Sequence, residues 1–373
     1  MADFTTFITT LAAEDFSGST GPSDSDVDVS SPQPSHIRFH NVTQVLIPLI
    51  MAIITVIGIS GNSIVLYIII RHREMQNITN FFIANLAVTD IALLVMCTIP
   101  TAANIAGILP ISDAMCKGVS YMQFVTVQAT CVTLTAMSVD RYILIVHAVK
   151  SRTTRTTNKA VFINVSIWLV SFLVHLPVAI YQTFKVEANM CVMPMGPDNA
   201  NEKYYYLFSF ISMYLLPLII ILVCYANILL MVWRKSSAGT ESAAAHERSI
   251  RQKRKITRMV FIVVLLFAVC WLPIQCILLW NNFHPVHATS MNPITLGSLH
   301  FFSLCLSYAN SCVNPFIYAF TTASFKKHFK RVFAFCVEPE ESADEKPTGN
   351  SGYRKAGKYV NEYSSVNTCD TKL

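Results

Sequence analysis

Charge is scarce in this sequence. Only 13% of its 373 residues are Asp, Glu, Lys or Arg, about half the share found in soluble domains. Residues 204–233 and 260–280 contain no charged side chain at all. Helices of soluble proteins carry a polar face, so these uncharged runs argue against a soluble helical core and indicate a membrane protein.

Seven runs are long and apolar enough to cross a bilayer as helices, which takes roughly 20 residues. They cover residues 45–70, 79–105, 118–139, 160–182, 204–233, 259–282 and 294–320. The sequence therefore predicts an all-α membrane protein in which residues 45–335 form a seven-transmembrane helix bundle. The polar segments on either side, residues 1–44 and 336–373, are predicted to be disordered tails.

Positive charge is nearly missing from one set of loops. Residues 283–293 contain no Lys or Arg, whereas residues 248–258 contain six. Cation-rich loops stay in the cytosol, so we expect a multi-pass plasma-membrane protein whose N-terminus lies outside. The chain also lacks a basic segment followed by an apolar one at its start, so no cleaved signal peptide is evident.

Two modifications are expected on the outer side. The sequon Asn41-Val42-Thr43 lies there, so Asn41 should carry a glycan. Most of the eleven cysteines lie in apolar runs, but Cys116 begins the third run and Cys191 precedes the fifth. Both face the oxidising compartment, and we expect a disulfide between them.

Carboxylates are absent from the middle of the spans except for Asp90. An unpaired charge at that depth costs about 2.5 to 3.5 kcal/mol, so Asp90 needs polar neighbours. We expect a buried polar cluster formed with Asn62, Thr130, Asn310 and Asn314.

Asp140 and Arg141 interrupt the third apolar run near its cytosolic end. Charged side chains at that depth can reach the membrane edge, so the pair alone is unremarkable. Four prolines lie inside apolar runs, where each removes a backbone hydrogen bond and permits a kink; they are Pro177, Pro217, Pro273 and Pro315.

Seven motifs occur in order along the predicted spans: GN at 61–62, NLAVTD at 85–90, Cys116, DRY at 140–142, Trp168, FAVCWLP at 267–273 and NPFIY at 314–318. The series resembles rhodopsin-like (class A) G-protein-coupled receptors over residues 45 to about 335. QATCVTLTAMSVDRY and CWLPIQ are most similar to kisspeptin receptors, and MQNITNFFIANLAVTD is also similar to galanin and allatostatin-A receptors. The chain departs from this group in lacking a Trp in GILPISDAM and in placing Pro100 ten residues after Asp90.

The resemblance implies a receptor without enzymatic activity. Its ligand would be an extracellular neuropeptide, most simply a kisspeptin-like amidated peptide, with a galanin or allatostatin-A type peptide as the alternative. It would signal through a heterotrimeric G protein, with a Gq-type protein, phospholipase C and calcium favoured. Arrestin and receptor kinases would be further partners.

The resemblance also assigns roles to residues. The ligand-binding residues would be Gln123, Tyr206, Trp271, Gln275, His300 and Tyr308. The cluster around Asp90 would hold an allosteric sodium ion, the one metal expected, and no cofactor is implied. The activation switch would comprise Asp140, Arg141, Tyr142, Tyr225, Trp271, Pro273, Asn314, Pro315 and Tyr318.

Further features that the sequence lacks argue against other classes of membrane protein. Residues 294–320 contain no Lys, which excludes a retinal Schiff base, and Gln123 stands where an amine receptor would carry an Asp. A transporter or channel, the remote alternative, predicts internal repeats or acidic rings, and the sequence shows neither. His284 and His287 alone are too few for a metal site, and nothing indicates a nucleic-acid partner.

Past the seventh run, residues 323–335 alternate Phe with Lys and Arg at helical spacing. This pattern predicts a short amphipathic helix on the anionic inner leaflet, with membrane lipid as its partner. Cys336 directly follows and is either a palmitoylation site or a plain surface cysteine. The terminal Thr371-Lys372-Leu373 fits a ligand of PDZ domains.

Overall fold

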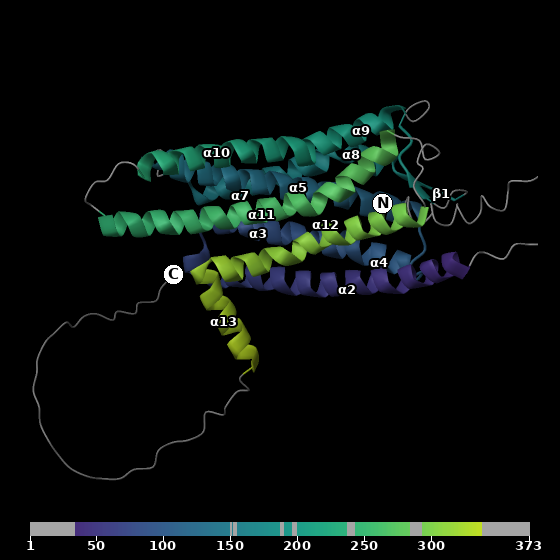
Figure 1. The fold of residues 1–373 in the computed structure, drawn as a ribbon, viewed down its shortest axis with the longest axis horizontal. Coiled ribbons are helices and arrows are strands. Elements are labelled where there is room, and N and C mark those ends of the chain that lie inside the picture. The colour runs from purple at the N-terminus through teal and green to yellow at the C-terminus, as the bar shows by residue number, and fades with distance from the viewer. Residues whose placement is uncertain are drawn as a thin grey trace, which may run out of the picture. The chain divides into compact units, whose positions relative to one another are not determined.

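Long helices make up most of the chain. The computed structural model describes residues 34–149, 151, 155–186, 190–195, 200–236, 243–283 and 293–337. Within residues 34–332, the long helices run side by side (Figure 1). They are α2 (Pro34–Arg71), α3 (Ile78–Leu93), α5 (Asp113–Val146), α7 (Thr157–Val174), α10 (Leu216–Ser236), α11 (Ala243–Phe283) and α12 (Pro293–Thr321).

Each helix packs against neighbours that lie far from it in sequence. α12 lies between α2 and α11, while α5 contacts α3, α7 and α10. The buried face of this bundle is a single large hydrophobic cluster, and many large apolar side chains, such as Phe162 and Leu222, point outward. Outward apolar faces are what a bundle needs in lipid.

Prolines coincide with interruptions in three of the spans. Pro100 follows η2 (Leu94–Thr98), a π-helical turn between α3 and α4 (Ile99–Ile105). Pro217 follows η4 (Ile211–Leu215), a similar turn between α9 (Ala200–Phe210) and α10. A proline ring clashes with the carbonyl one turn earlier, and a wider π-helical turn relieves that clash. The expected interruption at Pro177 is the break at His175 before α8 (Leu176–Tyr181).

The other two prolines, Pro273 and Pro315, lie inside continuous helices, α11 and α12.

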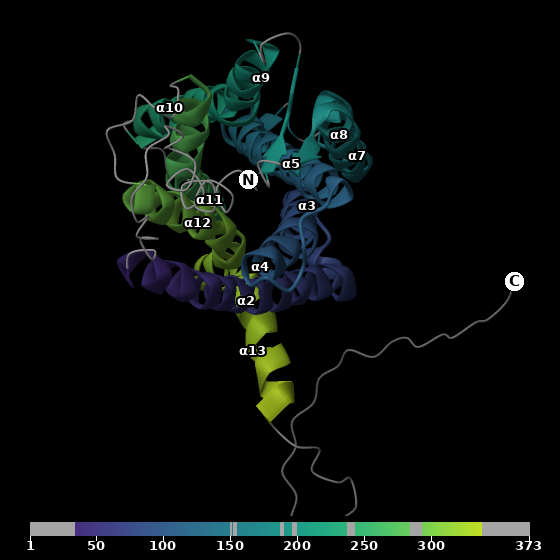
Figure 2. The same ribbon diagram turned by 90° about the vertical axis from the view of Figure 1, so that its right-hand side faces the viewer.

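One element was not predicted. β1 (Thr183–Lys185) pairs antiparallel with β2 (Met190–Val192), with Phe184 opposite Cys191. Strands of three residues are too short to show the alternating pattern that identifies a strand in sequence. We call the end of the bundle that carries this hairpin, together with α4, α8 and α9, the hairpin end (Figures 1 and 2).

The opposite end of the bundle carries the last turns of α5 and the short helix α13 (Ala323–Val337), which leaves α12 at a steep angle (Figure 1). We call it the Arg141 end. α13 begins where the amphipathic helix was expected and ends at Val337 rather than at residue 335.

The predicted seven-helix bundle is confirmed, with differences in detail. α2 begins at Pro34 rather than at residue 45, so part of the predicted N-terminal tail is helical. Among the described residues, six helices are long and apolar enough to cross a membrane. α12 is not one of them, because Ser and Asn residues and His300 lower its mean hydropathy.

Candidate functional site

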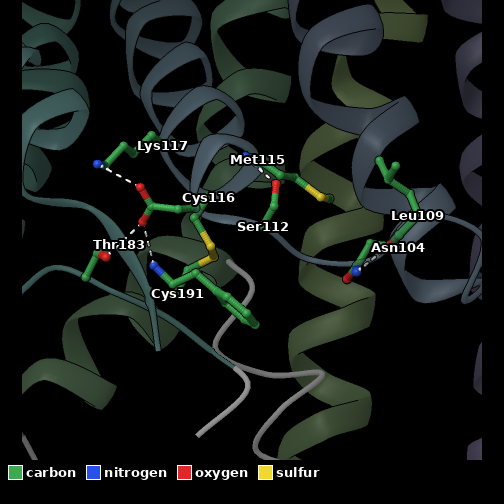
Figure 3. Close-up of a disulfide and its surroundings, with 10 residues drawn as sticks. Asn104, Leu109, Ser112, Met115, Cys116, Lys117, Thr183 and Cys191 are labelled. Atoms are coloured by element: carbon green, nitrogen blue, oxygen red, sulfur yellow. Dashed lines mark hydrogen bonds and ion pairs between the residues drawn. A yellow bond between two sulfur atoms is a disulfide. The ribbon is translucent and has the colours of Figure 1, made fainter. Parts of the chain in front are cut away.

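The hairpin is fixed to the bundle by a covalent bond. A disulfide joins Cys116 near the start of α5 to Cys191 in β2, with the two Cα atoms 5.6 Å apart (Figure 3). This is the bond expected from the sequence. Ser112 caps α5 just before it, because its hydroxyl accepts a hydrogen bond from the Met115 amide at 3.2 Å.

A second attachment of the hairpin escaped sequence reasoning. Asp113, the first residue of α5, accepts hydrogen bonds from the Thr183 hydroxyl at 2.8 Å and the Phe184 amide at 3.0 Å, both in β1. Its other carboxylate oxygen lies 2.8 Å from Lys117 Nζ. Asp113 thus fixes β1 as the disulfide fixes β2, and no periodic pattern in the sequence marks it.

A pocket lies between α5, α9, η4, α11 and Gln182, the residue just before β1. Four of the six predicted ligand-binding residues line it: Gln123, Tyr206, Trp271 and Gln275. The rest of its wall was not predicted and consists of Ser120, Phe124, Val127, Gln182, Met213 and Leu278. All ten lining residues are uncharged.

The other two predicted ligand residues lie on α12. Tyr308 is fully buried, and its hydroxyl donates a hydrogen bond to Gln123 Oε1 at 3.3 Å, so it contacts the pocket through Gln123. His300 is buried against Phe301 and does not line this pocket as the structure describes it. A neighbouring pocket lies beside the disulfide and shares Ser120 with the first.

Trp271 lies at the inner end of the pocket. Its ring stacks on Phe267, one turn earlier on α11, with 5.9 Å between the ring centroids, and Pro273 lies two residues after Trp271 in the same continuous helix. Its Nε1 is buried and has no hydrogen-bond partner among the described residues. A change in the pocket can therefore move this ring without breaking a hydrogen bond of its own.

The polar cluster expected around Asp90 is present in the core. Asp90 is 2% exposed, and its Oδ2 accepts a hydrogen bond from Asn314 Nδ2 at 2.8 Å. Thr130 donates to Thr89, the neighbour of Asp90, at 3.1 Å. Asn310 is buried one turn before Asn314 on α12.

Asn62 joins the cluster from α2. Its Nδ2 donates to the carbonyls of Gly58 and Ser311, each at 2.9 Å, while its Oδ1 is buried without a partner among the described residues. Gly58 and Gly61 let α2 lie close to Leu94 and to Pro315 of α12. A Cβ at Gly58 would collide with Leu94, and one at Gly61 would lie 3.0 Å from Pro315. A buried oxygen without a hydrogen-bond donor, such as Asn62 Oδ1, is suited to bind a cation.

At the Arg141 end, Asp140 binds two arginines. Arg141 Nη2 lies 2.9 Å from Asp140 Oδ2, and Arg141 is only 1% exposed. Arg155, which was not predicted as part of this site, donates from Nε to Oδ1 at 2.6 Å and from Nη2 to Oδ2 at 2.9 Å. Arg155 thus makes the stronger, bidentate pair.

The tyrosines of the predicted switch lie around this network. Tyr225 donates to the carbonyl of Thr257 at 3.3 Å and so joins α10 to α11. Tyr318 is fully buried against Phe325 of α13, with no partner for its hydroxyl in the described chain. Tyr142 points to His147, with 3.2 Å between the hydroxyl and Nε2.

Three expected sites lie outside the residues, or the side chains, that the structure describes. They are the Asn41 sequon, Cys336 and Thr371-Lys372-Leu373. His284 and His287 lie outside as well.

Comparison with known sequences decides the family. The family described as "7 transmembrane receptor (rhodopsin family)" matches residues 61–318, well over half of the chain. This chain belongs to the rhodopsin family of seven-transmembrane receptors. The receptor is accordingly a multi-pass protein of the plasma membrane, in a family of receptors rather than of enzymes, transporters or channels.

Individual relatives narrow the comparison. The receptor is 40% identical over 304 residues to "G-protein coupled receptor 54" of Oreochromis niloticus, which covers 78% of each chain. It is 37% identical over 296 residues to the "KiSS-1 receptor" of Homo sapiens, covering 77% of this chain and 74% of the relative. The "Allatostatin-A receptor" of Bombyx mori is 32% identical over 344 residues, covering 90% and 91%. The resemblance to kisspeptin and allatostatin-A receptors seen in the motifs is confirmed.

Proposed function

We propose that this receptor binds a kisspeptin-like peptide with an amidated C-terminus and activates a Gq-type G protein. The pocket at the hairpin end carries this proposal. It combines the amides of Gln123, Gln182 and Gln275 with the aromatic rings of Tyr206 and Trp271, and no charged side chain lines it. Glutamine amides can both donate to and accept from a neutral carboxamide.

The uncharged lining also disfavours a free C-terminal carboxylate. Placing that charge in a pocket without a cation leaves it unpaired, and burying an unpaired charge is costly. An amidated peptide with aromatic side chains avoids this cost and gains contact area from the rings. The similarity to a KiSS-1 receptor supports the kisspeptin type over other amidated peptides.

Cells that express the receptor would test this proposal. We expect an amidated kisspeptin to raise cytosolic calcium, the same peptide with a free C-terminal acid to be much weaker, and a Gq inhibitor to remove the response. Galanin and allatostatin-A peptides serve as the comparison panel. Potent responses to either of these with inert kisspeptins would overturn the ligand assignment, and a response through cyclic AMP alone would overturn the G-protein assignment.

We further propose that the hairpin end is extracellular, with the N-terminus outside. The cation-rich segments of the sequence, including residues 248–258, adjoin the ends of helices opposite the hairpin. A disulfide also suits the oxidising side of a membrane. An N-terminal epitope tag should be stained on intact cells, and Asn41→Gln should increase the receptor's gel mobility by one glycan; a tag stained only after permeabilisation would reverse the orientation.

We propose a sodium ion beside Asp90 as an allosteric ligand. Asp90 supplies a carboxylate, and the unpartnered Oδ1 of Asn62 supplies a second oxygen from the neighbouring helix. Hard cations prefer such oxygen ligands. Sodium should lower agonist affinity in the parent but not in Asp90→Asn; equal sodium sensitivity in both would remove the ion from this site.

The mechanism then connects the two ends. An agonist shifts the receptor only if it binds the active packing more tightly than the inactive one. We propose that the peptide moves Trp271 and so bends α11 at Pro273, which separates Tyr225 from Thr257 and releases Arg141 toward the G protein. Arrestin, receptor kinases, a palmitoyl group at Cys336 and a PDZ protein at the C-terminus remain proposed partners and modifications.

A further inference from the structure

A cluster of metal-binding side chains lies at the Arg141 end, apart from the sites above. His72 follows the last residue of α2, Glu74 lies in the short helix η1 (Arg73–Met75), and His328 lies in α13. One ligand atom from each residue lies within 4.8 Å of the others. The cluster thus joins the turn after α2 to α13, two segments more than 200 residues apart in sequence.

His328 occupies an unusual position for its helix. α13 presents Phe325 to the bundle, and His328, three residues later, is turned to the same side and is only 2% exposed. An apolar residue would pack there without any polar requirement. Its Nε2 lies 3.4 Å from Glu74 Oε1, while its Nδ1 is buried with no hydrogen-bond partner in the described chain. A buried nitrogen without a hydrogen-bond partner is costly. Metal binding would account for this position, because an ion must be reached by a ring that is held in place.

The three side chains form a recognised ligand set. Two imidazoles and one carboxylate bind zinc with a fourth position left for water, and imidazole also suits copper and nickel. The set is too poor in oxygen for calcium or magnesium, which prefer six or more oxygen ligands. The chemistry therefore favours a transition-metal ion.

A small rearrangement would complete the site. Zinc lies about 2 Å from each ligand atom, which keeps any two of them within about 4 Å. The His72 and His328 rings are stacked, with centroids 3.9 Å apart, whereas an ion must lie in the plane of each ring that binds it. His72 is half-buried in the turn and Glu74 is exposed, so these two can turn toward the buried His328.

Two cations lie near His328 on α13. Lys327 and Arg331 would repel a metal ion, so the site should be moderate in affinity.

We propose that His72, Glu74 and His328 form a binding site for a divalent transition-metal ion, in the first instance zinc, which fastens α13 to the turn after α2. The site is independent of the peptide and of the G protein. A bound ion would replace a single contact at 3.4 Å with three coordinate bonds, and so hold α13 in place against the bundle.

Purified full-length receptor, freed of metal in detergent, would test the site with zinc chloride alone. Losing even a group that supports a metal ligand weakens binding about 10- to 100-fold. We therefore expect His72→Ala and Glu74→Gln each to weaken zinc binding by at least about tenfold, measured by competition with a chromogenic chelator. Zinc should raise the melting temperature of the parent but not of these variants, whose metal-free melting temperature should equal that of the parent.

Two further variants make the result specific. Glu74→His keeps three ligands and should restore zinc binding. His284→Ala combined with His287→Ala removes a histidine pair elsewhere in the sequence and should leave this site's affinity and the melting shift unchanged. Cobalt bound to the parent should give the visible absorption of a four-coordinate site, and lose it in Glu74→Gln.

Equal zinc affinity in the parent, His72→Ala and Glu74→Gln would overturn the proposal. So would a parent whose melting temperature rises at acid pH and ignores zinc, because Glu74 and a protonated His328 would then form a plain ion pair.

Discussion

The two ends of this receptor are built from different interactions. At the hairpin end, a disulfide and the hydrogen bonds of Asp113 fix β1 and β2 over a pocket lined only by uncharged side chains. At the Arg141 end, the corresponding contacts are ion pairs: Asp140 is shared between Arg141 and Arg155. One end is held in a single arrangement, and the other is held by contacts that can be exchanged.

This difference fits the tasks proposed for the two ends. A recognition site gains affinity when it is ordered before the ligand arrives, and a covalent bond provides that order. A switch needs two arrangements of similar free energy. Asp140 offers a way to keep them close, because its charge stays compensated by Arg155 when Arg141 leaves.

Removing Arg141 should have the largest effect, because it should strongly reduce signalling at one end and leave peptide binding at the other end intact. In Arg141→Ala, Asp140 keeps its two bonds to Arg155, so no buried charge is left unpaired and the receptor should fold. We expect calcium signalling to fall by at least about tenfold while peptide affinity at the distant pocket changes little. Radioligand binding and calcium release, measured at matched surface expression, would check this.

Asp140→Asn is the matched opposite change. It leaves Arg141 and Arg155 as neighbouring cations without their common anion, so the arrangement seen here should lose stability and basal signalling should rise. Normal signalling from Arg141→Ala, or an unchanged basal level in Asp140→Asn, would show that these charges serve only as anchors at the membrane edge.

Breaking the disulfide should damage the other end instead. Cys116 and Cys191 are 75 residues apart, and closing a loop of that length stabilises a fold by about 4 kcal/mol. Cys116→Ser and Cys191→Ser should therefore each reduce surface expression and peptide binding. The signalling efficiency of those receptors that still bind peptide should stay near the parent value, and intact binding in both variants would make the bond dispensable.

The sequence predicted the Arg141 end better than the hairpin end. Asp140 and Tyr318 lie in the DRY and NPFIY motifs, and the structure places both at the same end of the bundle. The polar cluster was also predictable, because a carboxylate inside a span must find polar neighbours at its own depth. Length and apolarity located the helices, although α2 begins earlier than predicted and α12 is less apolar than the others.

The hairpin end depends on contacts that cross between loops and helices. Gln182 lines the pocket from the chain just before β1, and no motif in the sequence indicates that position. His300, also expected to bind ligand, is buried on α12 and does not line the pocket described here. Arg155 lies in none of the motifs, and only the structure shows its pairing with Asp140.

Asp113 provides a milder test of the hairpin end than the disulfide. Asp113→Ala removes the hydrogen bonds to Thr183 and Phe184 but keeps the covalent bond. The site is exposed and screened by solvent, so we expect peptide potency to fall only about two- to fivefold, with normal expression. Lys117→Ala is the control, since it removes the ion pair without touching the hairpin; an equal loss there would assign the effect to charge rather than to attachment.

The smallest effect is expected at Arg155. When Arg155→Ala removes the bidentate partner, Asp140 remains paired with Arg141 at 2.9 Å. Arg141 alone then compensates the charge of the Asp140 carboxylate. Arg155 is partly exposed, so the pair it makes is worth less than its short distances suggest. Basal signalling should stay at or slightly below the parent level, and Arg155→Lys, which keeps the charge but not the bidentate geometry, should match the parent.

Basal and peptide-stimulated calcium, measured beside Asp140→Asn at equal surface expression, would decide the point. If Arg155→Ala raised basal signalling as much as Asp140→Asn does, Arg155 would be what orients the carboxylate toward Arg141, and the exchange of partners would involve all three residues at once.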